Sequence, residues 1–325
     1  MKGCEDGCET MTGLVYHDDY LKHTMPQWHP EQPERLAAVV EHLKKTGLQG
    51  RLTAIAPRRA EVEWIAAIHS RGYIRVVEEV SRGGGLLDFG DTPVCPDSYD
   101  VARLAVGGMM RAVDAVMDGT VGNAFCLVRP PGHHARATQG MGFCIFNNIA
   151  IAARYLQKRH KLERILIADW DVHHGNGTQE AFYEDPTVLY FSVHRYGMFF
   201  PGTGAADERG AGAGTGYTIN VPLSAGGGRA EFLRALQEQL MPAAEHFQPE
   251  FVLISAGYDA HRDDPLGGMK LATEDYSDMA RIGMDIAKEQ CAGRMVATLE
   301  GGYNLEALAG SVAETLRVFL GGERG

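Results

Sequence analysis

The 325-residue chain lacks the features that mark secreted, membrane-spanning and nucleic-acid-binding proteins. Its opening, MKGCEDGCETMTG, has no apolar stretch of the signal-peptide type, and nowhere does an uninterrupted apolar span reach about 18 residues. The 42 acidic and 31 basic residues give a formal net charge of -11, whereas a protein that binds a nucleic-acid backbone normally carries a basic face. These absences predict a cytoplasmic protein that binds neither nucleic acid nor a membrane.

Cysteine is scarce, with six residues in the chain. Cys4 and Cys8 lie in a polar N-terminal tail. Their spacing could seat a metal or a disulfide, but we expect neither, because no second pair lies nearby. The other four lie in segments with the pattern of a core or its margins, where a free thiol behaves as a small apolar group: Cys95, Cys126, Cys144 and Cys291.

Linkers and common nucleotide or hydrolase motifs are also missing. No Pro- or Ser-rich linker, charge block or internal repeat divides the chain, so we expect one compact domain over residues 13–325 behind a tail of residues 1–12. The glycine-rich stretch 202–216 lacks the dinucleotide-binding spacing, and the chain has no Walker-type loop, nucleophile elbow or HExxH motif. We interpret 202–216 as a flexible surface loop.

Apolar strand-like runs alternate with helical patterns along the chain. The strand-like runs cover residues 125–128, 165–168, 188–193, 251–255 and 295–299. The helical patterns cover residues 147–159, 229–245, 274–288 and 305–320. Alternation of this kind, with near-continuous apolar strands, predicts a parallel sheet covered by helices on both faces.

Unusual polar residues follow the carboxyl ends of these runs. They lie at 129–134, 169–176, 194, 257–264 and 300–304. Ligands bind beyond the C-terminal strand ends of open parallel sheets, so these loops, each weak evidence alone, together predict one site. Three apolar loop residues could line a channel there or simply pack against it: Phe143, Phe200 and Leu266.

The densest polar run begins at Asp169, directly after an apolar run. Alternate strand residues point the same way, which predicts that Asp169, Asp171 and His173 share one face. Two carboxylates at the end of a core strand are costly to desolvate without a cation or hydrogen bonds, so a metal site is the simplest interpretation. Asp171, His173 and Asp259 offer the three protein ligands of a catalytic zinc. A helix-capping role is the alternative for Asp259.

Two histidines add acid–base chemistry to this region. We expect the tandem side chains of His133 and His134 to diverge, one acting as general base and acid and the other tuning the charge beside it. Asp169 and Asn176 are the candidates to fix their tautomers. Tyr303, which follows two glycines, could stabilise an oxyanion. Ordinary loop histidines and a packing tyrosine are the alternatives.

A set of motifs in fixed order carries a family resemblance: RPPGHH, GFCIFNN, DWDVHHGNG, FFPGTG, SAGYDAHRDDPLGG and LEGGYN. Together they resemble the histone deacetylase family, most closely its class II and bacterial deacetylase-like amidohydrolase branch, and HPEQPERL near residue 29 is similar to the class II opening segment. The resemblance covers roughly residues 13–320. It implies the arginase-like α/β fold, a single three-layer catalytic domain with a central, mostly parallel sheet of about eight strands. It also implies zinc-dependent removal of an acyl group from an amine.

The resemblance assigns roles to the site residues. One catalytic zinc is implied, with ligands Asp171, His173 and Asp259. The other catalytic positions are His134 as general base and acid with Asn176 behind it, His133 backed by Asp169, and the transition-state tyrosine Tyr303. The substrate positions are the tunnel walls Phe143 and Phe200 with the flanking Gly142, the residue Leu266, and a rim aspartate at Asp91. Arg35 matches an arginine near the acetate-release channel.

The family also binds one or two structural potassium ions, which would offset the clustered carboxylates. The matching first site comprises Asp169, Asp171, His173, Ser192 and Val193. The matching second site, more solvent-facing, comprises Phe182, Asp185, Val188 and Tyr217.

The resemblance favours an acylated lysine of a peptide or protein as substrate, with an acetylpolyamine amidohydrolase as the alternative. Polyamine-specific relatives place an acidic residue at the position of Leu266, where leucine suits an acyl-lysine tunnel. An arginase-type two-metal hydrolase would need an acidic ligand at the position of Gly175. A binding protein without catalysis would not need the full set of matched residues. The sequence leaves a homo-oligomer open.

Overall fold

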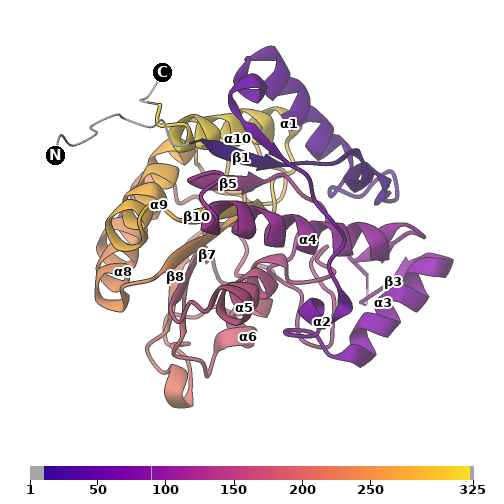
Figure 1. Ribbon diagram of the computed structural model, residues 1–325, viewed down its shortest axis with the longest axis horizontal. Coiled ribbons are helices and arrows are strands. Elements are labelled where there is room, and N and C mark those ends of the chain that lie inside the picture. Colours follow the sequence, from indigo (N-terminus) through magenta and orange to yellow (C-terminus); the bar gives the residue numbers. More distant parts are fainter. Residues whose placement is uncertain (1–10, 89, 323–325) are drawn as a thin grey trace.

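The structure is a computed structural model that describes residues 11–88 and 90–322. Its centre is an eight-stranded sheet in which every neighbouring pair of strands is parallel, as the resemblance implies (Figure 1). In spatial order the strands are β2 (Thr53–Ile55), β1 (Thr12–Val15), β5 (Asn123–Cys126), β10 (Met295–Leu299), β9 (Phe251–Ala256), β6 (Ile165–Asp169), β7 (Val188–Arg195) and β8 (Thr218–Leu223). A separate antiparallel pair consists of β3 (Gly85–Leu86) and β4 (Pro93–Val94).

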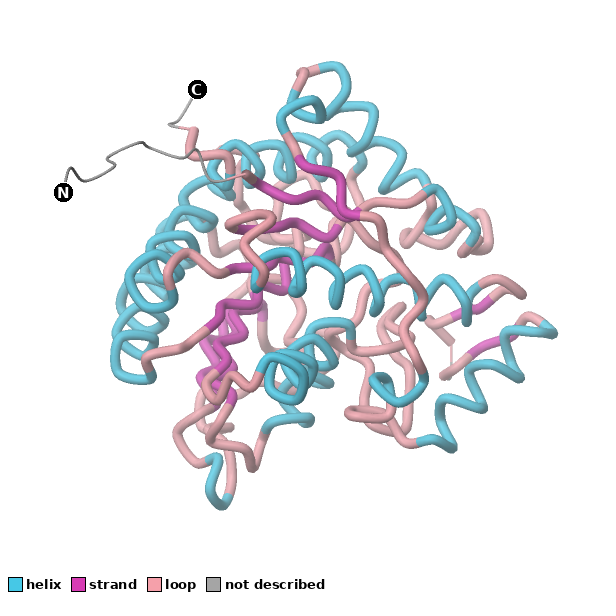
Figure 2. Tube along the Cα trace, viewed as in Figure 1, coloured by secondary structure: helices cyan, strands magenta, loops and turns pink. Residues whose placement is uncertain are grey.

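Helices cover both faces of the sheet, and Figure 2 shows the strands enclosed between them. One layer contains α2 (Val62–Ile65), α3 (Arg71–Gly83), α4 (Ser98–Met117), α5 (Asn148–His160) and α6 (Asn176–Phe182). The other contains α1 (Glu34–Lys45), α7 (Arg229–Ala235), α8 (Met241–Phe247), α9 (Asp275–Cys291) and α10 (Leu305–Phe319). Every residue of β5, β6, β9 and β10 is buried, as expected for a parallel sheet covered on both sides. The predicted three-layer α/β architecture is confirmed.

The five loops that were predicted to form one site follow strands that are neighbours in the sheet. The spatial order β5-β10-β9-β6-β7 places their carboxyl ends side by side along one edge. Because all five strands are parallel, the loops after them emerge on the same side. This strand order brings together residues more than 150 positions apart in the sequence, such as His133 and Glu300.

Some sequence predictions fall outside the described residues or need correction. Cys4, Cys8 and most of the predicted tail are not described, and Thr12 already belongs to β1. The other four cysteines are free thiols, buried except for the half-buried Cys95. The stretch 202–216 is a largely exposed loop, but it is bonded to the rest of the fold: the Gly204 carbonyl lies 2.9 Å from His194 Nε2, and Gln179 Nε2 donates to Glu208 Oε2 over 2.6 Å.

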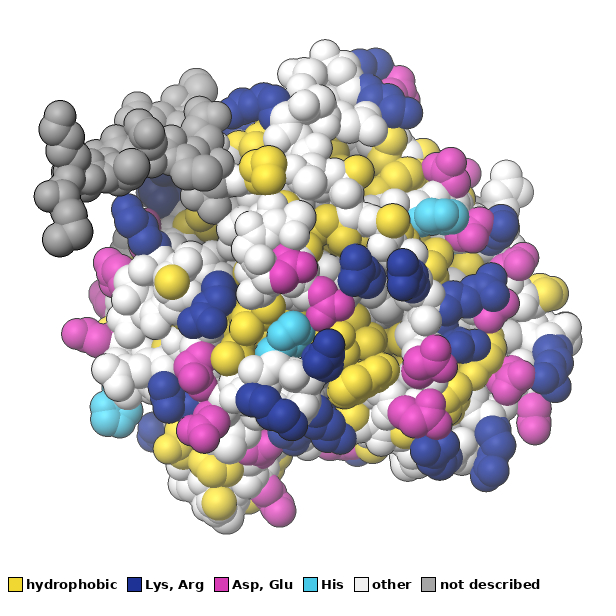
Figure 3. All heavy atoms as spheres, viewed as in Figure 1, with side chains coloured by type: hydrophobic (Ala, Val, Ile, Leu, Met, Phe, Trp, Pro, Cys, Tyr) yellow, Lys and Arg dark blue, Asp and Glu magenta, His cyan; other side chains and the backbone are white. Residues whose placement is uncertain are grey.

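Neither the helices nor the drawn surface has the features of a membrane-spanning or nucleic-acid-binding protein in residues 11–88 and 90–322. Among the helices of residues 11–88 and 90–322, none combines the length and apolar character needed to cross a bilayer. On the face drawn in Figure 3, Asp and Glu side chains lie among the Lys and Arg side chains. That face is not the continuous basic surface by which proteins bind a nucleic-acid backbone.

At Gly107, helix α4 packs closely on the chain segment that precedes α2. A Cβ at this position would overlap the carbonyl oxygen of Arg58 and lie 2.9 Å from the amide nitrogen of Ala60. We therefore expect Gly107→Ala to destabilise the fold by about 1–3 kcal/mol, the usual range for overpacking, although alanine favours a helix. Gly72→Ala in α3 is the control, because only one atom lies near its added Cβ, at 3.8 Å. Urea unfolding compares the two variants, and equal stabilities would contradict this packing.

Candidate active site

The proposed zinc ligands meet where β6 ends and the chain bends. The strand ends at Asp169, so Asp171 and His173 are not strand residues. The prediction that strand alternation places them on one face with Asp169 is therefore wrong. The bend nevertheless places His173 Nδ1 3.0 Å from Asp171 Oδ1 and 3.1 Å from Asp259 Oδ2. The ligand atoms of Asp171, His173 and Asp259 all lie within 4.8 Å of one another. Asp169 faces His133 instead.

Main-chain groups hold both carboxylates in position. Val172 N donates to Asp259 Oδ1 over 2.9 Å, and Gly301 N donates to Asp171 Oδ2 over 2.8 Å. A Cβ at Gly301 would lie 2.6 Å from Asp171 Oδ2, and one at Gly257 would lie 2.5 Å from Asp171 Cγ. Glycine at both positions therefore lets the backbone approach the ligand group closely.

The two carboxylates of this group repel each other. Asp171 and Asp259 are fully buried, and across the described chain their ion-pair partners are the imidazoles of His133 and His173. Burial and the charge of Asp171 raise the pKa of Asp259 to about 7. A bound cation would relieve this repulsion. Two carboxylates and one imidazole are a donor set that suits a catalytic zinc, so these residues fit the ion that the sequence predicts.

The two histidines have separate partners but do not diverge as expected. Their ring centroids are 4.0 Å apart. His133 Nδ1 lies 3.0 Å from Asp169 Oδ2, and His134 Nδ1 lies 2.8 Å from Asn176 Oδ1, the predicted pairing. Burial would lower the pKa of His133, but the charges of Asp169 and Asp171 raise it to about 10. Burial, His133 and His173 lower the pKa of His134 well below its usual range, so adjacent imidazoles hold different charge states.

Tyr303 lies in the loop between β10 and α10. Its amide donates to Asp264 Oδ2 over 2.7 Å, and its ring lies edge-on to that of Phe143 at 5.7 Å. The guanidinium carbon of Arg35 lies 4.9 Å from the ring centroid. Burial raises the pKa of Tyr303 well above its usual value, so the phenol remains a hydrogen-bond donor at neutral pH.

Two of the predicted tunnel residues, Gly142 and Phe200, lie against the ring of His134. Gly142 adopts φ +56°, and a Cβ there would lie 2.5 Å from the His134 ring and 2.9 Å from the Phe200 ring. Phe200 contacts His134 edge-on at 5.0 Å. Sequence reasoning missed Phe199, which stacks on His173 with centroids 4.9 Å apart and an interplanar angle of 7°. Its place beside Phe200 in FFPGTG was the available signal.

Asp91 contacts the backbone of this tunnel. Its Oδ1 accepts a hydrogen bond from Gly142 N over 3.0 Å, and its carbonyl oxygen lies 3.1 Å from His29 Nε2. Burial and the neighbouring Asp88 raise the pKa of Asp91 to about 6. Asp91 is therefore attached to the tunnel wall, and the rim role remains a prediction.

The two predicted potassium sets each lie near β7. Asp169 pairs with Ser192 across β6 and β7 in the first set. In the second set Asp185 N donates to the Phe182 carbonyl over 3.0 Å, while the Asp185 carboxylate forms an ion pair of 2.6 Å with Arg154. The remaining members are Val193, Val188 and Tyr217. Potassium binding remains a prediction at both places.

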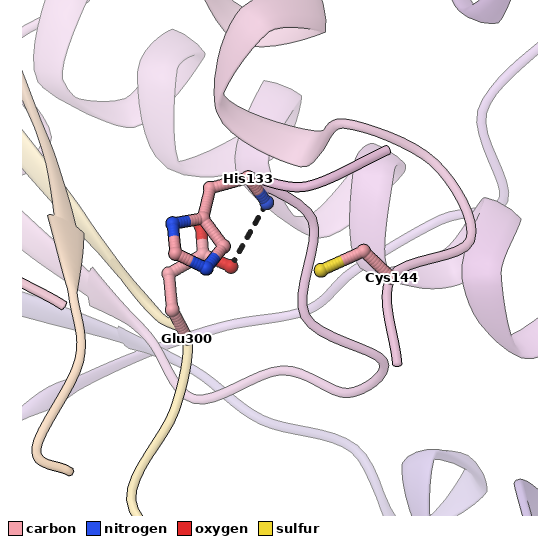
Figure 4. A group of neighbouring side chains, drawn as sticks. All are labelled: His133, Cys144 and Glu300. Carbon is pink, nitrogen blue, oxygen red and sulfur yellow. Dashed lines mark hydrogen bonds between the residues drawn. The ribbon is translucent and has the colours of Figure 1, made fainter. Parts of the chain in front are cut away.

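A second cluster beside the site comprises His133, Cys144 and Glu300 (Figure 4). Glu300 Oε2 accepts hydrogen bonds from the amides of Gly132 and His133, over 2.7 and 3.2 Å, and Oε1 accepts one from Ser255 Oγ over 3.0 Å. Sequence reasoning gave Glu300 no role of its own. Through these bonds Glu300, which follows β10, holds the loop of residues 129–134 that carries His133 and His134. We call this loop the histidine loop and Glu300 its clamp.

Comparisons with known proteins agree with this geometry. The family model described as "Histone deacetylase domain" matches residues 29–319. A "Probable deacetylase" of Archaeoglobus fulgidus is 43% identical over 91% of this chain and 82% of its own length. Human "Polyamine deacetylase HDAC10" is 41% identical over 95% of this chain, which spans 48% of that relative. The crystal structure of the HDA15 HD domain superposes with a TM-score of 0.92 at 40% identity, covering 97% of this chain and 91% of that one.

Proposed function

This chain belongs to the histone deacetylase family of metal-dependent deacetylases, and from that premise we propose that it removes acetyl or other short acyl groups from lysine side chains with one catalytic zinc. The observation that carries the proposal is the buried ligand group of Asp171, His173 and Asp259, which lies beside the adjacent rings of His133 and His134.

The side chains around the ligand group have different roles in the proposed reaction. A zinc ion held by Asp171, His173 and Asp259 would supply Lewis-acid polarisation of the amide carbonyl and would make water a nucleophile near neutral pH. Neutral His134, with Nδ1–H directed at Asn176, accepts a proton from the attacking water through Nε2 and delivers it to the leaving amine. Tyr303 donates a hydrogen bond to the carbonyl oxygen as negative charge develops. Charged His133, held by Asp169, adds positive charge beside the reaction centre.

Gly175 supports one catalytic metal over two. A Cβ at this position would lie 2.7 Å from the Tyr190 hydroxyl and 3.1 Å from His133 Nδ1, and it would overlap the carboxylate of Asp169. An acidic ligand at position 175, which the two-metal alternative needs, would therefore displace the His133–Asp169 hydrogen bond. This crowding favours a single zinc.

The side chains near the tunnel favour acyl-lysine over acylpolyamine substrates. Leu266 is 36% exposed, and its amide donates to Asp264, the residue that also holds the Tyr303 amide. Trp28 is 75% exposed and precedes His29, whose ring contacts Phe143 at 4.6 Å. A second ammonium group of a polyamine would meet leucine rather than a carboxylate at position 266. Acetylpolyamine hydrolysis remains the second candidate because human HDAC10, a polyamine deacetylase by name, is 41% identical.

A substrate panel tests this proposal. We expect higher kcat/KM for acetyl-lysine peptides than for acetylspermidine and acetylputrescine. Leu266→Glu should raise the ratio of polyamine to peptide turnover about two- to fivefold, the effect of one exposed ion pair. Val76→Glu, at an exposed apolar residue of α3, is the control for added charge. A strong wild-type preference for polyamines would overturn the acyl-lysine assignment. Absence of turnover for every acylated amine would overturn the proposal that the protein is a deacylase.

A further inference from the structure

A buried carboxylate outside the reaction centre lies between two buried arginines. Glu31, Arg35 and Arg129 are each 0% exposed. Arg35 Nη1 donates to Glu31 Oε1 over 3.0 Å, and Arg129 Nε and Nη2 donate to Oε1 and Oε2 over 2.5 and 2.7 Å. Burial would raise the pKa of Glu31, but the guanidinium groups of Arg129 and Arg35 lower it to about 2, so the group is ionised.

Arg35 connects Glu31 to the loop between β10 and α10 that contains Tyr303. Its Nε donates to the Gly302 carbonyl over 2.7 Å, and its Nη2 donates to the Glu300 carbonyl over 2.5 Å. Between those two carbonyls lies the Gly301 amide that donates to the ligand Asp171. The same guanidinium covers the ring of Tyr303. Arg35 thus fixes the backbone on both sides of Gly301 and the face of the tyrosine ring.

Arg129 connects Glu31 to the loop that contains His133 and His134. It stands four residues before His133, and its Nη1 and Nη2 donate to the carbonyls of Tyr20 and His23, each over 3.0 Å. Two histidines also lie beside Glu31: His23 Nε2 is 3.7 Å from Oε2, and His29 Nδ1 accepts a hydrogen bond from the Glu31 amide over 3.1 Å. Burial and Arg129 lower the pKa of His23 to about 3, so it adds no charge. Glu31 is therefore the anion that compensates both arginines.

We propose that Glu31 is a positioning residue: through Arg35 and Arg129 it sets the placement of Tyr303 relative to the His133–His134 pair. The proposal rests on the proposed function, because it assigns Glu31 to that same reaction. Glu31 contacts none of the proposed catalytic side chains directly, so it acts through the two arginines. Its removal would leave two guanidinium groups buried without their shared anion, a strongly unfavourable arrangement that the two loops would relieve by shifting apart.

Glu31→Gln keeps the side-chain shape and removes the charge. We expect kcat for an acetyl-lysine peptide to fall about 10- to 100-fold, the usual effect of losing an outer partner of a catalytic group, with KM within about twofold and zinc content unchanged. Glu31→Asp should recover part of the loss. Glu34→Gln, the same charge change at an exposed residue three positions away, should leave kcat unchanged. An unaltered kcat in Glu31→Gln would overturn the proposal.

A double-mutant cycle with Tyr303→Phe separates positioning from general stability. If Glu31 acts by placing the tyrosine hydroxyl, Glu31→Gln should cost little more in the Tyr303→Phe background. Losses that multiply would overturn the proposal. Should Glu31→Gln fail to fold, Arg35→Lys enters the same cycle, because lysine keeps the charge but lacks the planar guanidinium fork that bonds the two loop carbonyls. Wild-type turnover is the separate check: an inactive wild type would refute the proposed function, whereas an active wild type with multiplying losses would refute this inference alone.

Discussion

Replacing Asp259 by asparagine is expected to lower kcat/KM for an acetyl-lysine peptide about 10³-fold and to deprive the protein of zinc. Asparagine has nearly the same size, and its amide oxygen can still accept the hydrogen bond from Val172 N. It supplies no negative charge to the group that contains Asp171 and His173, however, and a neutral amide is a weak zinc ligand. Elemental analysis measures the zinc, and an acetate-release assay measures the rate.

Asp263→Asn is the matched control for this change. Asp263 lies in the same loop as Asp259, but its side chain is 61% exposed and its nearest ion-pair partners lie at 3.6 and 3.8 Å. We expect this variant to keep both its zinc and its rate. If Asp259→Asn also retained a full equivalent of zinc and wild-type turnover, the assignment of the ligand group would be wrong.

Tyr303→Phe is expected to lower kcat about 10²- to 10³-fold, the usual cost of losing one oxyanion donor, while KM and zinc content change little. The ring of Phe would keep the contacts with Phe143 and Arg35, so only the hydroxyl is lost. Because the hydrogen bond strengthens as charge develops on the carbonyl oxygen, its loss affects the transition state more than the bound substrate.

Tyr196→Phe provides the comparison for Tyr303→Phe. Tyr196 is 40% exposed and follows β7, and its ring contacts His194 at 6.4 Å. Loss of its hydroxyl should leave kcat unchanged. A Tyr303→Phe enzyme with near-wild-type kcat would show that Tyr303 only packs in the loop, the simpler interpretation that the sequence also allows.

The fold was predictable where strands are central and apolar. The runs that became β5, β6, β7, β9 and β10 are buried on both faces, and burial of that kind leaves a clear pattern in the sequence. The strands β1, β2 and β8 were missed because β2 and β8 form the sheet edges, and because only two of the four residues of β1, Leu14 and Val15, are apolar. Among the helices, α4 was missed although it is long, because its glycines and small residues blur the helical period.

The site residues that can be recognised within a single loop were predictable from the sequence. The need to fix imidazole tautomers indicated Asp169 and Asn176 as partners, and the family resemblance assigned them to His133 and His134, the pairing found in the structure. The clamp at Glu300 and the charge cluster around Glu31 were not predictable from the residues, because both depend on loops that meet only through strand order. The bend after Asp169 was missed because strand alternation explains the same spacing.

Zinc titration of the chelated protein is the most direct test of the central claim that one buried Asp171–His173–Asp259 group holds the catalytic metal. Zinc is added back in steps, and acetate release from an acetyl-lysine peptide is measured at each step. The predicted result is an inactive chelated protein whose activity rises in proportion to zinc and reaches its plateau at one equivalent per chain. A plateau at two equivalents, or full turnover in the chelated protein, would contradict the account.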